Sequence, residues 1–141
     1  MTRGQALTAV VLAHLAVNIA HGRAHDGAQV PLTALGMLFV YVVILAAPLI
    51  GLGIWRWQPR LGGWIVAASM SGALAFGVIN HFIIDGSDHV AHVAAAWRQL
   101  FGVTAALLVA CEAAGAAIGL WAASPPRARQ DAASVPGSMS L

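Results

Sequence analysis

Four long apolar stretches constrain the fold of this chain more than any other feature of its sequence. A helix rises 1.5 Å per residue, so about 20 apolar residues cross the hydrocarbon core of a bilayer. Charged residues make up 9% of the 141 residues, against about 25% in an average soluble domain. Too few charges remain to cover a soluble fold of this size. The sequence therefore predicts an integral membrane protein with spans at about residues 5–22, 31–55, 61–84 and 93–123.

Short connections between these stretches restrict how the helices are arranged. The segments "HGRAHDGAQVP", "RWQPR" and "DGSDH" separate successive stretches. Because short connections join neighbours that run in opposite directions, we expect an all-α, integral membrane four-helix bundle with up-down-up-down topology over residues 1–123. Residues 124–141 are rich in proline, serine and alanine, a composition that predicts a disordered tail.

The distribution of arginines predicts the orientation in the membrane. One side of such a bundle collects five of the seven arginines, namely Arg3, Arg56, Arg60, Arg127 and Arg129. By the positive-inside rule both termini are then cytoplasmic, and the His-rich loops are extracytoplasmic. The arginines are scattered and form no basic patch, so we expect the lipid bilayer, and not a nucleic acid, as the main partner.

A cleavable signal peptide over residues 1–24 is a rival interpretation of the first stretch. One arginine precedes the apolar run, and "GRA" before His25 resembles a cleavage site. However, His14 and Asn18 interrupt the run. We therefore favour a retained first span.

Polar residues in the first span follow one helical face. His14, Asn18, His21 and His25 are separated by four, three and four residues, the spacing of neighbours on a helix. A polar stripe on a membrane helix must turn away from lipid, toward the bundle or a wet cavity.

A second group of polar residues surrounds the end of the third span. His81 and Asp85 are four residues apart, and Gly86 follows them. We expect Ser87 or Asp88 to cap the fourth helix, with His89 and His92 on its first turns. Because the first and third helices point the same way, both groups converge at one end of the bundle. The predicted metal ligands there are His21, His25, His81, Asp85, His89 and His92.

Imidazole and carboxylate groups together suit zinc, copper, iron or manganese. Such a site fits metal handling, or redox chemistry with a membrane-soluble partner such as a quinone. The first alternative is a haem b electron-transfer protein, with His21 and His81 as axial ligands. The second is a non-catalytic subunit of a membrane complex. No nucleotide fingerprint or catalytic triad motif appears, so any catalysis would take place at the metal or haem.

Two further features lie deeper in the spans. Glu112 is predicted near the bilayer midplane at a depth similar to His14, and pairing would lower the cost of burying either polar group. The pair serves either as polar contact between helices or as part of a proton path toward the cluster. Small residues recur every four positions at Cys111, Gly115 and Gly119, and at Ser69, Ala73 and Gly77. They predict close helix packing within the bundle or in a homo-oligomer.

Overall fold

The structure is a computed structural model that describes residues 1–125, and within that range it is all-helical, without strands. Four helices are long and apolar enough to cross a membrane, at Arg3–Ala28, Ala34–Trp55, Pro59–Ile83 and Ala95–Ala123. The prediction of an all-α fold with four helices of membrane-spanning length is confirmed. The predicted tail lies almost wholly outside the described residues.

Seven segments make up these four spans. The first is α1 (Arg3–Ala28) and the last is α5 (Ala95–Ala123). The second span consists of α2 (Ala34–Phe39), the π-helical segment η1 (Val40–Ala46) and α3 (Ala47–Trp55), and the third of α4 (Pro59–Val78) and the π-helical segment η2 (Ile79–Ile83).

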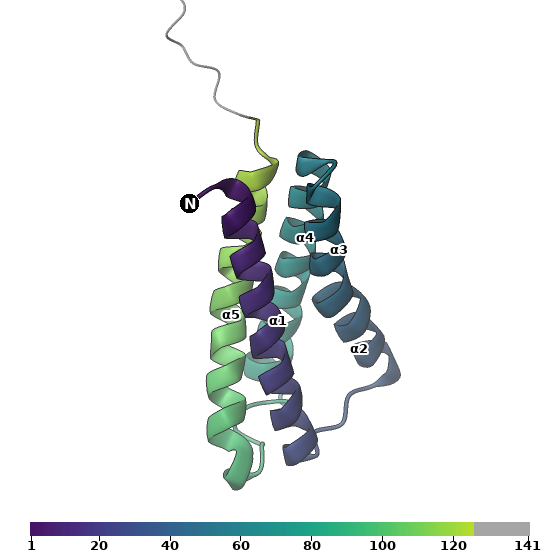
Figure 1. The fold of residues 1–141 in the computed structure, drawn as a ribbon. Coiled ribbons are helices and arrows are strands. Elements are labelled where there is room, and N and C mark those ends of the chain that lie inside the picture. The colour runs from purple at the N-terminus through teal and green to yellow at the C-terminus, as the bar shows by residue number, and fades with distance from the viewer. Residues whose placement is uncertain (126–141) are drawn as a thin grey trace, which may run out of the picture.

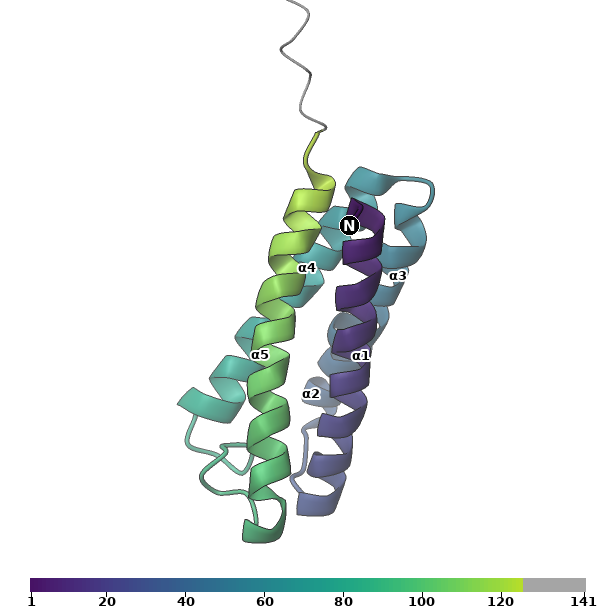
Figure 2. The same cartoon turned by 60° about the vertical axis from the view of Figure 1, so that its left-hand side comes forward.

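The helices pack side by side in a bundle, and most of the contacts between them involve α4 or α5. Helix α5 packs against both α1 and α4, and α4 packs against α3 (Figures 1 and 2). The N-terminus, the connection between α3 and α4, and the end of α5 lie together at one end of the bundle (Figure 1). The connections from α1 to α2 and from η2 to α5 lie at the opposite end.

The helix boundaries differ from the predicted ones at the end that carries the histidines. Helix α1 continues to Ala28 and ends at Gln29, which has a left-handed backbone with φ 53°. His25 is therefore helical. The prediction that His89 and His92 begin the fourth helix was wrong, because α5 starts only at Ala95 and its N-cap is Ala94.

The loop before α5 is held by contacts that compete with helix formation. The backbone N–H of Val90 donates to the carbonyl of His81 at 3.0 Å, which folds the loop back onto η2. Val93 is buried against Ala24 and Phe101. Neither Ser87 nor Asp88 caps α5, and the Asp88 carboxylate lies instead beside two histidine rings.

The two π-helical segments lie next to Pro48 and around His81, respectively. Segment η1 precedes Pro48, which has no N–H and whose ring would clash with the carbonyl four residues earlier. The N–H of Ala47 bonds to Val42, five residues back, as in a π-helix. Segment η2 contains His81 and ends with an N–H of Ile84 bonded to Ile79 at 2.8 Å. Such π-helical turns recur at functional sites.

Helices α4 and α5 approach each other through glycines. A β-carbon on Gly119 would lie 2.7 Å from the backbone nitrogen of Ala67, and one on Gly63 would lie 2.7 Å from that of Ala123. A β-carbon on Gly115 would lie 2.9 Å from Met70. The predicted small-residue face at Gly115 and Gly119 is thus used within the chain, where it lets two backbones come into contact.

Replacing Gly119 by alanine should force α4 and α5 apart. We expect a loss of about 1–3 kcal/mol in the free energy of unfolding, as for other overpacked cores. Reversible unfolding in mixed detergent micelles would measure it. Gly102→Ala is the matched control, because no atom lies within 4 Å of a β-carbon there. Equal stability of the two variants would contradict close packing at Gly119.

Candidate metal centre

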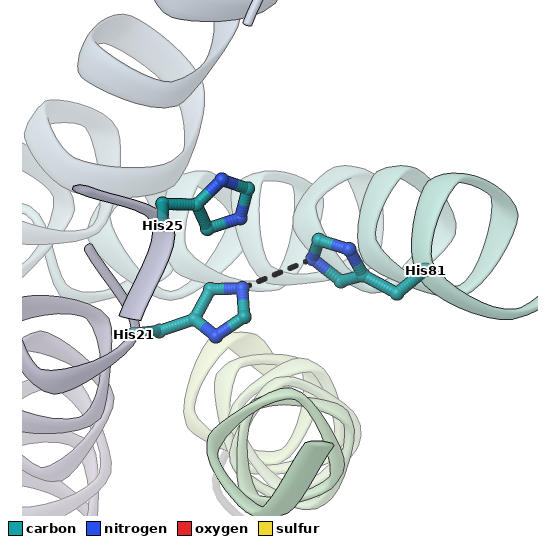
Figure 3. A group of neighbouring side chains, drawn as sticks. All are labelled: His21, His25 and His81. Atoms are coloured by element: carbon teal, nitrogen blue, oxygen red, sulfur yellow. Dashed lines mark hydrogen bonds between the residues drawn. The ribbon is translucent and has the colours of Figure 1, made fainter. Parts of the chain in front are cut away.

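Three histidines from two helical segments meet at one end of the bundle. His21 and His25 lie one turn apart on α1, and His81 reaches them from η2 (Figure 3). One nitrogen from each ring lies within 4.8 Å of the other two. The three side chains are therefore close enough to hold a metal ion.

The hydrogen bonds of His21 identify which of its nitrogens carries a proton. Its Nδ1 lies 2.9 Å from the hydroxyl oxygen of Thr104 on α5. That hydroxyl donates its own hydrogen to the carbonyl of Leu100 at 2.7 Å. With its hydrogen used in this way, the Thr104 oxygen accepts from Nδ1–H of His21, and the neutral form of that ring then carries a lone pair on Nε2.

His81 is held in the same protonation pattern. Its Nδ1–H donates to the backbone carbonyl of Asp88 at 3.1 Å, since a carbonyl can only accept. In the neutral form of this ring, Nε2 therefore also carries a lone pair. The Nε2 atoms of His21 and His81 face each other 3.1 Å apart (Figure 3). Two lone pairs at this distance repel each other unless a cation or a proton lies between them.

Asp88 lies beside two of the three rings. Its Oδ1 is 3.2 Å from Nδ1 of His81 and 3.3 Å from Nε2 of His25, although neither contact has hydrogen-bond geometry. Burial favours the neutral carboxyl, but the close approach of His81 and the charge of His25 outweigh it. The pKa of Asp88 therefore lies below its usual value. The carboxylate thus lies within ion-pair distance of two rings, where outer-shell carboxylates lie at metal sites.

Phe101 forms an apolar base beneath the cluster. Its ring centroid lies 4.8 Å from those of His21 and His25 and 5.2 Å from that of His81. The Phe101 side chain is fully buried. It excludes water from one side of the rings and limits their movement.

The remaining predicted ligands lie apart from this cluster. Asp85 and His92 are exposed and contact each other at 3.2 Å, and the ring of His89 lies 5.5 Å from that of His92. Within residues 1–125, the group of possible metal ligands contains only His21, His25 and His81. Thr104 and Phe101 were not anticipated from the sequence, because a threonine and a phenylalanine in an apolar span carry no distinguishing signal.

A second polar contact lies deeper in the bundle. Nε2 of His14 on α1 is 3.3 Å from Oε1 of Glu112 on α5, and both side chains are buried. The amide nitrogen of Asn18 donates to the carbonyl of His14 at 3.0 Å and also lies 2.9 Å from Nε2 of His14. The other oxygen of Glu112, Oε2, is buried without a hydrogen-bond partner.

A cavity of about 450 Å³ joins the two polar regions. Glu112 and Asn18 line one part of it, and the three histidines and Asp88 line the other. Most of the remaining wall is apolar and comes from α1, α2, η1, α4 and α5. The cluster thus borders a space large enough for a small molecule.

Comparison with known protein families, curated proteins and solved structures finds no match. The functional argument therefore rests on the residues themselves.

The contact between His14 and Glu112 should appear as a coupling in a double-mutant cycle. We expect a coupling free energy of roughly 1 kcal/mol between His14→Leu and Glu112→Leu, as for polar contacts between membrane helices. Unfolding of the two single variants and the double variant in mixed micelles would measure it. A parallel cycle of Glu112→Leu with His89→Leu should be additive. Additivity in the first cycle as well would show that the pair contributes nothing.

Proposed function

We propose that this chain is an integral membrane metalloprotein in which His21, His25 and His81 hold one divalent transition metal ion. The observation that carries the proposal is the approach of the Nε2 atoms of His21 and His81 to 3.1 Å, while Nδ1 of each ring lies against a hydrogen-bond acceptor. Two nitrogens bound to one tetrahedral ion at 2.0–2.1 Å lie roughly 3.3 Å apart. An ion would therefore fit this separation with little movement and would remove the repulsion between the lone pairs.

The surroundings of the three rings also support an ion. Thr104 and the Asp88 carbonyl accept from the Nδ1–H groups of His21 and His81, as outer-shell acceptors do at histidine-ligated metals. His25 Nδ1 is buried without a hydrogen-bond partner. A shared proton could bridge only two of the three rings, whereas a metal ion can bind one nitrogen from each of them.

The donor set favours zinc, with copper and iron next. Imidazole nitrogen suits these three metals, whereas manganese prefers oxygen ligands. Three protein ligands leave one position of a four-coordinate ion for water or a substrate, as in zinc sites that carry out chemistry. The proposed role is metal handling, or chemistry on a molecule bound in the adjoining cavity.

We place the metal on the extracytoplasmic side. Arg3, Arg56 and Arg60 belong to the opposite end of the bundle, and the positive-inside rule assigns that end to the cytoplasm. The extracytoplasmic end then carries the three histidines and Asp88.

Haem b is the weaker candidate. Two axial nitrogens on opposite sides of one iron would lie about 4 Å apart at ordinary metal–nitrogen distances. The Nε2 atoms of His21 and His81 are closer than this. Rings of His25 and Phe101 also lie within 6 Å of the His81 ring, in the space that a porphyrin would need.

Removing two ligands should remove the metal. We expect about one equivalent of metal in the purified protein after loading with zinc, and a loss of about tenfold or more in affinity in the variant His21→Ala/His81→Ala. Elemental mass spectrometry of the detergent-solubilised protein would measure the metal content.

The matched control is His89→Ala/His92→Ala, which removes the same number of imidazoles from the exposed loop. Its metal content should equal that of the original protein. Iron accompanied by a Soret absorption band would instead favour haem. Absence of metal from every sample after loading would leave a structural role for the polar residues.

Thr104 should act on metal affinity through His21. Thr104→Val removes the acceptor of Nδ1–H, and we expect zinc affinity to fall by about 10- to 100-fold, as for other outer-shell changes. Competition with a zinc chelator would measure it. Thr104→Ser keeps the hydroxyl and should restore the affinity. Equal affinity of the valine and serine variants would contradict the positioning role.

A further inference from the structure

The cavity beside the metal centre opens toward lipid. Three of its lining residues are exposed, namely Ile19 on α1, Met37 on α2 and Tyr41 on η1. All three lie within spans that are apolar enough to cross a membrane. Exposed side chains at such positions face the bilayer, so a molecule dissolved in lipid can enter between α1 and the α2–η1 segment.

The interior of the cavity offers hydrogen-bonding groups at two separate places. Glu112 is 2% exposed, and its Oε2 has no hydrogen-bond partner. The histidine cluster and Asp88 line another part of the same cavity. A molecule that reaches both places needs polar atoms at two ends of its head group.

Gly77 lies between these two places. A β-carbon on Gly77 would lie 3.8 Å from Oε2 of Glu112 and 3.9 Å from Cδ2 of His81. Ala73, Phe76 and Leu108 supply an apolar wall in the same cavity. A flat apolar ring fits this surrounding better than a fully polar head group does.

We propose that the cavity binds a neutral, lipid-soluble para-hydroquinone or para-quinone. One ring oxygen would contact Glu112, the opposite oxygen would face the metal centre, and the alkyl tail would leave between α1 and η1. The inference rests on the proposed function in one respect: the metal ion at the histidine cluster would hold the second oxygen. The volume of about 450 Å³ is within the range of small-molecule sites.

Binding of three probes with the same tail would test the inference. 2-Decyl-1,4-hydroquinone carries two opposite hydroxyls, 4-decylphenol carries one, and decylbenzene carries none. Retention of each probe by the protein in lipid nanodiscs, corrected for empty nanodiscs, gives its affinity. We expect one hydroquinone per chain, weaker binding of the phenol and none of decylbenzene above the lipid background.

A variant that fills the cavity should weaken this binding without replacing a metal ligand. We expect Gly77→Leu, whose side chain would lie beside Glu112 and His81, to weaken hydroquinone binding by about tenfold or more, and the metal content of the same sample is measured alongside. Gly53→Leu is the matched control, because a β-carbon on Gly53 meets no atom within 4 Å and Gly53 does not line the cavity. The control variant should bind hydroquinone as the original protein does.

The outcomes separate this inference from the metal proposal. Metal without hydroquinone binding, equal binding of decylbenzene, or unchanged binding in Gly77→Leu would each overturn the inference. Selective hydroquinone binding that Gly77→Leu abolishes would support it, even in a protein that holds no metal. If Gly77→Leu does not fold, Ile19→Trp at the cavity mouth replaces it, and the same loss of binding is expected.

Discussion

Imidazole groups on one face of α1 determine how that helix sits in the bundle. Lipid offers no hydrogen-bond partners, so polar side chains within a span must find them in neighbouring helices. His14 meets Glu112 and His21 meets Thr104, both on α5. These two contacts lie two helical turns apart along α1 and orient the whole stripe toward α5. The same rotation of α1 brings His25 and His21 to His81.

The class of fold could be predicted from the sequence because lipid imposes a simple rule. Apolar stretches long enough to span the membrane must be helical. Which helices pack together did not follow from chain order, because α1 packs mainly against α5 and only weakly against the second span. The boundaries were less predictable near the histidines. Helix α1 runs through "HGRAHDGA" to Ala28, because His21 and His25 point into the bundle while Arg23 and Asp26 stay exposed on the same helix.

Part of the site followed from helical periodicity, and part depended on tertiary contacts. Spacing along α1 brought His21 and His25 to one face, and topology brought His81 near them. The loop before α5 was misjudged because Asp88 and Val93 are held by the histidine rings and by Phe101, respectively, and not by a helix end. The sequence alone does not reveal which loop residues will pack against side chains of the helices. For the same reason, His89, His92 and Asp85 could not be separated from the cluster beforehand.

The glycine contact between α4 and α5 has a mechanical consequence. Where Gly63 and Gly119 bring two backbones together, no layer of side chains remains that could slide or repack. These two helices therefore have little room to slide past each other. The α2–η1 segment has a widened π-helical turn next to Pro48 and borders a cavity instead of a packed core.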